Sequence, residues 1–220
     1  MGMGNRRIPA VEEKKRLSHA NSETLRSYEA RVAEYVEGTP SEVAGAVKEW
    51  IDAVLSGLPA EARIVELGSA FGRDAAYIAS KGFAVECTDA VAGFVVELQS
   101  RGFKARQFNL LGDELDRGYD LIFANAVLLH FNRSEFVVVL KKLIGSLASG
   151  GCCAFSLQRG KGEAWSEAKI GAPRYFCYWE RDDLDPLLRD AGFSRWAVEE
   201  AHTARAHADW LYVTAWAPLR

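Results

Sequence analysis

The stretch Arg63–Asp74, with the sequence Arg-Ile-Val-Glu-Leu-Gly-Ser-Ala-Phe-Gly-Arg-Asp, decides the fold that we expect. Its first part is apolar and begins with the β-branched residues Ile64 and Val65, which is typical of a short buried strand. Glycines follow at positions 68 and 72, and a helix-like segment comes next. A glycine-rich turn lets a ligand approach the backbone closely, and the first N–H groups of a helix have no partner within it. The stretch therefore predicts a ligand-binding turn or, as the plainer alternative, a structural strand-to-helix turn.

The spacing of small residues in this turn bears on the choice of ligand. The turn reads G-x-A-x-G, and an acid, Glu66, stands two residues before Gly68. A dinucleotide-binding turn would read G-x-G-x-x-G, and the spacing in this chain differs from that pattern, which argues against a nicotinamide dinucleotide as the ligand. The turn alone leaves its ligand open.

Strand-like and helix-like runs alternate along the rest of the chain, which predicts an α/β fold with a mostly parallel sheet. The last two strands are close in sequence, with no helix-length pattern between them, and so predict an antiparallel hairpin at one edge. Beyond the central strand we expect strands at 83–89, 104–109, 119–125, 152–157, 195–200 and 210–216, and helices at 22–37, 41–57, 74–80, 93–101, 133–147 and 182–191.

The amino-acid composition limits which classes of protein the chain can belong to. The chain has 220 residues, 49% hydrophobic and 26% charged, which is the balance of a globular protein. Its net charge of −3 and the lack of a basic stripe argue against nucleic acid as a partner. No apolar run reaches the roughly 20 residues of a membrane span, and the start has no apolar signal core. The four cysteines form no C-x-x-C pair, so we expect reduced thiols in a cytoplasmic protein, without a metal site.

Polar residues stand where the predicted parallel strands end. Ligands of open parallel sheets bind outside these carboxyl ends. After the glycine turn come Asp89 at the end of the second strand, Asn109 at the third and Asn125 at the fourth, with His130 close behind. An acid about 20 residues beyond the glycine turn is placed to hold a ribose.

This ordered set resembles class I S-adenosylmethionine-dependent methyltransferases over Ala62–Leu157, with Ala70 in place of the usual middle glycine. The resemblance implies a Rossmann-like, seven-stranded sheet with helices on both faces, and S-adenosylmethionine as cofactor. Asp89 would hold the ribose, with Ala90 alongside. Asn109, where the family often has Asp, and Leu110 would flank the adenine. The full set of implied cofactor-binding residues is Tyr28, Tyr35, Glu66, Gly68, Ser69, Ala70, Gly72, Asp89, Ala90, Asn109, Leu110, Asn125 and Ala126.

Several of these residues have plainer alternatives. Asp89 could cap the next helix, and Asn125 could be a turn residue. Tyr28 and Tyr35, which the resemblance places in a lid over the cofactor, could be core residues of one helix face. His130 could be the general base that takes a proton from the acceptor, or a packing residue near a helix start.

The segment after the fifth strand is rich in glycine, charge and aromatic residues, and we expect a flexible loop on the acceptor side. An ordinary insertion that packs on the sheet is the alternative. The acceptor-binding residues expected there are Arg159, Arg174, Tyr175 and Tyr178.

The resulting hypothesis is a methyltransferase that acts on an O or N atom of a small molecule. Residues 1–21 would form a flexible arm, 22–58 a helical cap, and 59–220 the S-adenosylmethionine-binding catalytic domain. Three other functions stay open: different chemistry at the sulfonium, a nicotinamide-dependent oxidoreductase, or a non-catalytic binding module. The sequence does not fix the acceptor or an oligomeric state.

Overall fold

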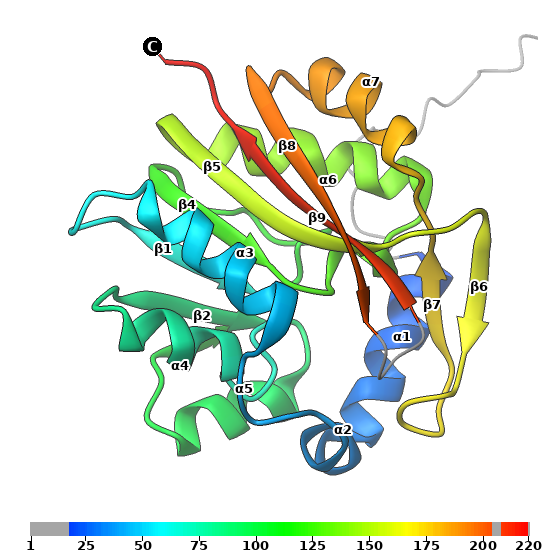
Figure 1. Cartoon of the computed structure of the whole chain (residues 1–220). Coiled ribbons are helices and arrows are strands. Elements are labelled where there is room, and N and C mark those ends of the chain that lie inside the picture. The colour runs from blue at the N-terminus through cyan, green and yellow to red at the C-terminus, as the bar shows by residue number, and fades with distance from the viewer. Residues whose placement is uncertain (1–17, 204–207, 220) are drawn as a thin grey trace, which may run out of the picture.

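The computed structural model describes residues 18–203 and 208–219. Its centre is a seven-stranded sheet with the order β3-β2-β1-β4-β5-β9-β8 (Figure 1). The strands are β1 (Ile64–Leu67), β2 (Val85–Asp89), β3 (Ala105–Gln107), β4 (Tyr119–Ala124), β5 (Leu147–Gln158), β8 (Arg195–Thr203) and β9 (Ala208–Trp216).

The pairing of these strands confirms the predicted fold. The strands β1 to β5 are parallel, whereas β9 runs antiparallel between β5 and β8. All four residues of β1 are buried, because helices cover both faces of the sheet. The strand β5 begins at Leu147, earlier than predicted, and runs through Gly150 and Gly151. A side chain at Gly151 would lie 2.7 Å from the Tyr119 carbonyl oxygen, so glycine permits the close approach of β4.

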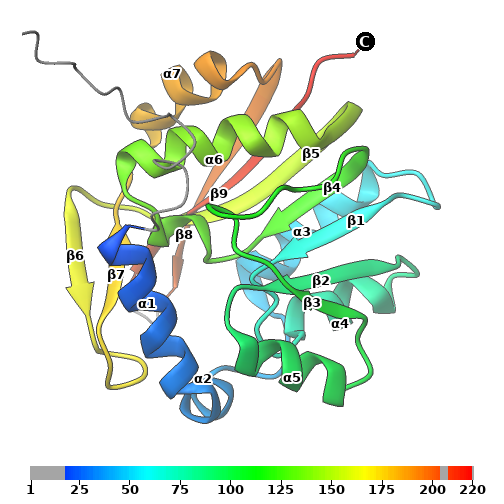
Figure 2. The same cartoon turned by 180° about the vertical axis from the view of Figure 1, so that it is seen from behind.

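Helices cover the two faces of the sheet in separate layers (Figures 1 and 2). On one face lie α3 (Gly45–Ser56), α4 (Arg73–Ser80) and α5 (Ala92–Ser100). On the other face lie α6 (Arg133–Ser146) and α7 (Arg181–Ala191). Trp50 of α3 is buried against Phe123, and its Nε1 donates to Thr214 Oγ1 at 3.2 Å, which ties α3 to the sheet.

The carboxyl edge of the sheet is covered by α1 (His19–Ala30) and α2 (Val32–Gly38). The sequence predicts one helix over 22–37, but the structure has two, because the backbone leaves the helical region at Arg31 (φ −135°). The side chain of Ser18 caps α1 by accepting from the Asn21 N–H.

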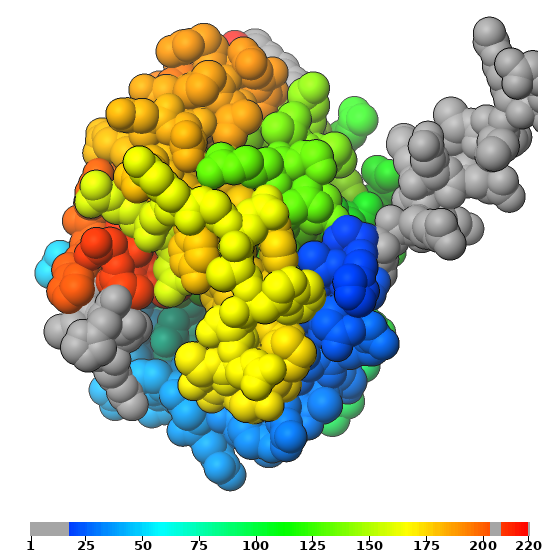
Figure 3. Space-filling view, turned by 90° about the vertical axis from the view of Figure 1, so that its right-hand side faces the viewer, coloured from blue at the N-terminus to red at the C-terminus, as the bar shows by residue number. Residues whose placement is uncertain are grey.

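A second sheet of two strands, β6 (Glu163–Ser166) and β7 (Arg174–Cys177), lies against α1. In the space-filling view this β6–β7 hairpin, in yellow, packs beside the helices α1 and α2, in blue (Figure 3). The predicted flexible loop is therefore in part a paired hairpin, and β7 is buried at all four positions.

Most of the predicted arm, residues 1–17, lies outside the described residues. Of the predicted cap, α1 and α2 lie over the carboxyl edge, whereas α3 packs on a face of the sheet. The domain boundaries remain a prediction.

The four cysteines are free and buried. Within the described residues, no helix has the length and apolar character needed to cross a membrane.

Candidate active site

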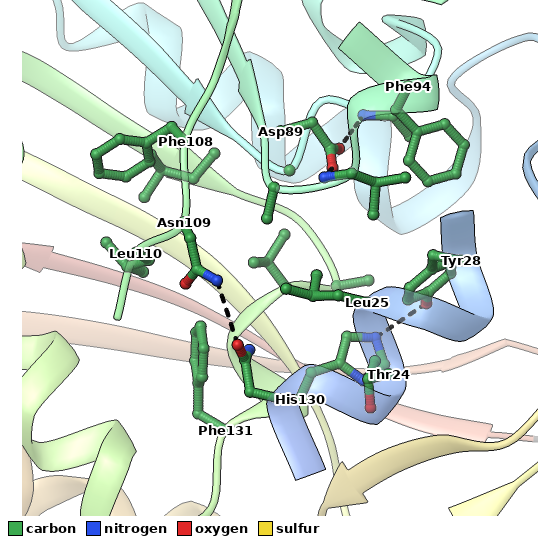
Figure 4. Close-up of a pocket in the computed structure, with 18 of the residues that line it drawn as sticks. Thr24, Leu25, Tyr28, Asp89, Phe94, Phe108, Asn109, Leu110, His130 and Phe131 are labelled. Carbon is green, nitrogen blue, oxygen red and sulfur yellow. Dashed lines mark hydrogen bonds between the residues drawn. The ribbon is translucent and has the colours of Figure 1, made fainter. Parts of the chain in front are cut away.

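A pocket opens at the carboxyl ends of β1, β2 and β4, beneath α1 (Figure 4). The space inside it, including its open mouth, is about 740 Å³. Its wall is largely apolar with a few polar groups. The lining residues are Asn21, Thr24, Leu25, Tyr28, Tyr35, Leu67, Gly68, Ala70, Asp89, Ala90, Val91, Phe94, Phe108, Asn109, Leu110, Asn125, Ala126, Val127, His130 and Phe131.

Bare backbone forms the floor of this pocket. Gly68 has φ +68°, and a Cβ there would lie 2.5 Å from Val127 Cγ2, so only glycine fits. Ala70 (φ +48°) and Ala126 (φ +58°) also adopt the left-handed conformation that a residue with a Cβ seldom takes. Such strain gathers at functional sites, and here it brings the main chain of two strand ends to the pocket.

The carboxylate of Asp89 ties the loop after β1 to the loop after β2. Its two oxygens accept the N–H groups of Ala70 and Val91, each at 2.9 Å. Burial raises the pKa of Asp89 to about 6, against the lowering effect of these hydrogen bonds. Asp89 therefore holds the turn before α5 and also lines the pocket, and its role toward a ribose stays a prediction.

A second pocket adjoins the first and shares Tyr35, Gly68, Ala70, Asn125 and Ala126 with it. Its other lining residues are Thr39, Glu66, Ser69, Phe71, Arg73 and Asp74.

Asp74 links two other polar side chains of the second pocket, whereas one carboxyl oxygen of Glu66 has no partner. Arg73 Nε lies 2.7 Å from Asp74 Oδ1, and Asn125 Nδ2 donates to Asp74 Oδ2 at 2.7 Å. Glu66 is buried, and its Oε2 has no hydrogen-bond partner. Burial, and then the nearby charge of Asp74, raise the pKa of Glu66. A cationic group of a ligand would favour the ionised form of this buried carboxyl group and supply the missing partner of its oxygen.

The far end of the first pocket lies against the segment after β3. Asn109 faces it together with Phe108 and Leu110 (Figure 4). Both ends of the Asn109 amide are engaged, because Nδ2 donates to Asn21 Oδ1 at 3.3 Å and Oδ1 accepts from the Leu111 N–H at 3.0 Å. These bonds hold the turn and fasten α1 to it.

A chain of hydrogen bonds runs along the wall formed by α1. His130 Nδ1 lies 2.6 Å from the Tyr175 carbonyl oxygen, which can only accept, so Nδ1 carries the proton. Nε2 is then free to accept from the Tyr28 hydroxyl at 3.0 Å, and Arg174 Nη1 donates to that same hydroxyl at 3.2 Å. Burial lowers the pKa of His130 to about 4, so its imidazole is neutral near pH 7.

The structure brings most of the predicted cofactor-binding residues together. Tyr28, Tyr35, Gly68, Ala70, Asp89, Ala90, Asn109, Leu110, Asn125 and Ala126 line the first pocket, and Glu66 and Ser69 line the second. Gly72 lines neither. Its φ is +85°, and a Cβ there would lie 2.6 Å from Phe103 Cε2, so this glycine serves the start of α4 and its packing.

The predicted acceptor-binding residues divide into two groups. Arg174 and Tyr175 are buried on β7, directly behind Tyr28 and His130, whereas Tyr178 stacks on Phe176. Arg159 instead points to the surface, where it forms ion pairs with Glu180 at 3.3 Å and Glu200 at 2.9 Å. None of the four residues lines either pocket.

Several pocket residues were not predicted from the sequence: Thr24 and Leu25 of α1, Val91 and Phe94 around the start of α5, and Phe131 after His130. Their apolar or small side chains resemble those of a core. The only sequence signal was position, since Val91 and Phe131 each closely follow a predicted polar residue.

The site fits S-adenosylmethionine. The orphaned oxygen of Glu66 suits the ammonium of the methionyl part, and the cradle at Gly68 leaves room for a ligand. Asp89 is a pocket-facing acceptor suited to a pair of hydroxyls.

Comparisons with known proteins agree with this geometry. Residues 40–198 match the family model described as a methyltransferase domain. A search of the curated proteins gives no match. Among solved structures, the chain resembles the 1,6-didemethyltoxoflavin-N1-methyltransferase of Burkholderia thailandensis, solved with 1,6-didemethyltoxoflavin and S-adenosylhomocysteine, at 19% identity and a TM-score of 0.70 over 92% of each chain.

Two further structures share the fold. The phosphoethanolamine N-methyltransferase 2 of Haemonchus contortus, in complex with phosphomonomethylethanolamine and S-adenosylhomocysteine, is 12% identical with a TM-score of 0.69, over 93% of this chain and 61% of that one. A methyltransferase of Methanosarcina mazei is 15% identical with a TM-score of 0.65, over 76% of this chain and 98% of that one. Since the family model spans more than half of the chain, the protein belongs to the methyltransferase domain family, as a class I S-adenosylmethionine-dependent methyltransferase.

Proposed function

We propose that this methyltransferase modifies an O or N atom of a small-molecule acceptor, which binds between the pocket and the elements α1, α2 and β6–β7. The observation that carries this proposal is the hydrogen bond from the Tyr28 hydroxyl to the neutral His130 at the pocket wall. A nucleophilic O–H or N–H group must lose its proton during methyl transfer, and this pair offers a place for that proton.

The chain would hold the cofactor across both pockets. Asp89 would accept the ribose hydroxyls, and Phe108 and Leu110 would flank the adenine. Glu66 would accept the ammonium of the methionyl part, beside the backbone at Gly68. When bound, S-adenosylmethionine supplies a methyl group on a positively charged sulfur. The chain then has to align the acceptor with that methyl group and exclude water.

Tyr28 and His130 would move the proton together. Because Nε2 of His130 already accepts from Tyr28, the acceptor cannot reach it directly. The acceptor proton would pass to the Tyr28 oxygen while the Tyr28 proton passes to Nε2. The Tyr175 carbonyl, which accepts from Nδ1, would stabilise the imidazolium that forms.

The helix α1 would act as a lid over the acceptor. It is fastened on three sides: Thr24 Oγ1 accepts from the Tyr175 N–H at 3.0 Å, Glu29 accepts from the Gly93 N–H at 3.0 Å, and Asn21 bonds Asn109. A pocket covered in this way favours a small acceptor over a polymer. The acceptors in the two ligand-bound structures named above are also small molecules.

The experiment is an unbiased acceptor screen with isotopically labelled S-adenosylmethionine, read by mass spectrometry of the products. We expect a methylated O or N atom and S-adenosylhomocysteine in equal amounts. Formation of methylthioadenosine, or cofactor binding without turnover of any acceptor, would overturn the proposal.

A further inference from the structure

Arg174 is a buried cation without a counter-ion. Its side chain on β7 is only 6% exposed and lies between aromatic rings, with Cζ 5.6 Å from the Tyr28 centroid and 5.1 Å from that of Phe176. Within residues 18–203 and 208–219 it forms no ion pair with a carboxylate. Removing a charge from water without pairing it is costly, so a structural role alone explains this arginine poorly.

The hydrogen bonds of Arg174 are also incomplete. Nη1 donates to the Tyr28 hydroxyl, but Nε is fully buried without a partner. No described residue accepts a hydrogen bond from Nη2 either. A guanidinium presents its N–H groups as a fork that matches carboxylate and phosphate oxygens, and here most of that fork is unused.

A second cation, Lys169, lies nearby at the ring of Tyr35. Lys169, between β6 and β7, holds its Nζ 3.7 Å from the centroid of the Tyr35 ring. Tyr35 in turn packs against Tyr28, with ring centroids 5.5 Å apart. Desolvation first, and then the nearby charges of Arg174 and Arg73, lower the pKa of Lys169 to about 8. No carboxylate within the described residues pairs with Lys169, so the two cations share an unneutralised region beside the pocket wall.

We propose that Arg174 and Lys169 bind an anionic group of the acceptor, a carboxylate or a phosphate, and so place its nucleophilic atom at Tyr28. The inference rests on the proposed function, because it assigns the acceptor of that same site. An oxyanion would complete the fork of Arg174 and neutralise both cations. Because Nε is covered in this arrangement, binding must displace part of α1 or the β6–β7 hairpin, which together enclose it.

Direct anion binding tests the inference without a known acceptor. The protein loaded with S-adenosylhomocysteine is titrated calorimetrically with inorganic phosphate and, separately, with benzoate, at constant ionic strength. We expect Arg174→Gln to weaken binding of at least one of these anions by about tenfold or more, the scale of a charge-assisted hydrogen bond. Lys169→Gln should weaken it by a smaller factor. Lys161→Gln, at an exposed lysine of the same segment, is the matched control and should leave it unchanged.

The comparison of phosphate with benzoate identifies which oxyanion the site prefers. Equal anion affinity in wild type, Arg174→Gln and Lys169→Gln, or no binding of either anion, would overturn the inference. If Arg174→Gln does not fold, Lys169→Gln at its exposed position decides the same question.

Acceptors are then screened as matched acids and neutral amides. Turnover of the amides alone would also overturn the anion inference, while methyl transfer itself would stand. Failure of all acceptors despite Arg174-dependent anion binding would instead count against the proposed function.

Discussion

The proposed cofactor side and the proposed acceptor side of this site are built in different ways. On the cofactor side, Asp89 bonds Val91 two residues away and Ala70 19 residues away, all within neighbouring strand ends. On the acceptor side, the bond between Tyr28 and His130 spans 102 residues, and those from Arg174 to Tyr28 and from Tyr175 to Thr24 span 146 and 151. The contacts of Asp89 therefore form within the sheet and its loops. The contacts of Tyr28, His130 and Arg174 form only when α1 and the β6–β7 hairpin pack against each other and against the sheet.

This difference predicts that the two halves can be damaged separately. Changes on the acceptor side should lower turnover and leave cofactor affinity intact. Changes in the glycine turn should instead lower the affinity for the cofactor. The predictions below run from the largest expected effect to the smallest.

His130→Gln should lower the turnover number about 10²–10⁴-fold, the range for losing a general base, with little change in the affinity for S-adenosylhomocysteine. Tyr28→Phe should lower it in a similar way, because the proposed proton path runs through the Tyr28 hydroxyl. Steady-state kinetics with a cognate acceptor and calorimetry measure the two quantities. Tyr77→Phe, which removes a hydroxyl bonded to Asp52 away from the pocket, is the control. Full activity of both variants would show that the pair is structural.

Gly68→Val should weaken the binding of S-adenosylhomocysteine by about 100-fold or more, because the new side chain meets Val127 and takes the ligand's place. Its circular dichroism spectrum should stay largely native. Gly82→Val is the matched control: its φ of +93° is equally unfavourable, but no atom lies within 4 Å of the added Cβ. Normal binding by Gly68→Val would remove this turn from the proposed cofactor site.

The buried His130 should also appear in the pH dependence of stability. Its pKa is lowered to about 4 in the folded state, so between roughly pH 6.5 and pH 4 the unfolded chain binds a proton that the folded chain does not. The free energy of unfolding should therefore fall as the pH falls through this window, by up to about 3 kcal/mol.

Chemical denaturation of wild type and His130→Gln at several pH values isolates this contribution. Asp89, whose pKa is raised to about 6, acts in the opposite direction but is present in both proteins, so it cancels in the difference. A difference between the two proteins that does not change with pH would contradict the buried, neutral imidazole.

Asp89→Asn should weaken the binding of S-adenosylhomocysteine by about 1.5–3 kcal/mol, because the amide cannot accept from both loops and from the ribose. Calorimetric titration measures the loss. Asp120→Asn is the control, since Asp120 also accepts a backbone N–H, that of Arg63 at 2.8 Å, but at the opposite end of the sheet. Unchanged affinity in a folded Asp89→Asn protein would mean that Asp89 only caps the turn.

The comparison also explains what the sequence could predict. The strands and the polar residues at their ends follow from local periodicity, so the sequence predicts the fold and many of the residues that line the two pockets. Gly72, predicted to bind the cofactor, lines neither pocket, because spacing does not tell a glycine at a pocket from one that packs against Phe103. The break at Arg31 and the pocket role of Thr24 depend on docking between segments that are distant in the chain. Such contacts leave no local pattern.

Arg159→Ala should have the smallest effect, although the sequence places Arg159 among the acceptor-binding residues. Its guanidinium bridges Glu180 and Glu200 at the surface, and exposed ion pairs contribute only about 0–1 kcal/mol. We expect KM for the acceptor and the turnover number to change less than about twofold, and the free energy of unfolding to fall by at most about 1 kcal/mol. Arg174→Gln, measured beside it, should raise KM strongly, because the two arginines differ in burial and in having counter-ions. A large rise in KM with Arg159→Ala would mean that the acceptor site extends along the end of β5, beyond the enclosure formed by α1 and the β6–β7 hairpin.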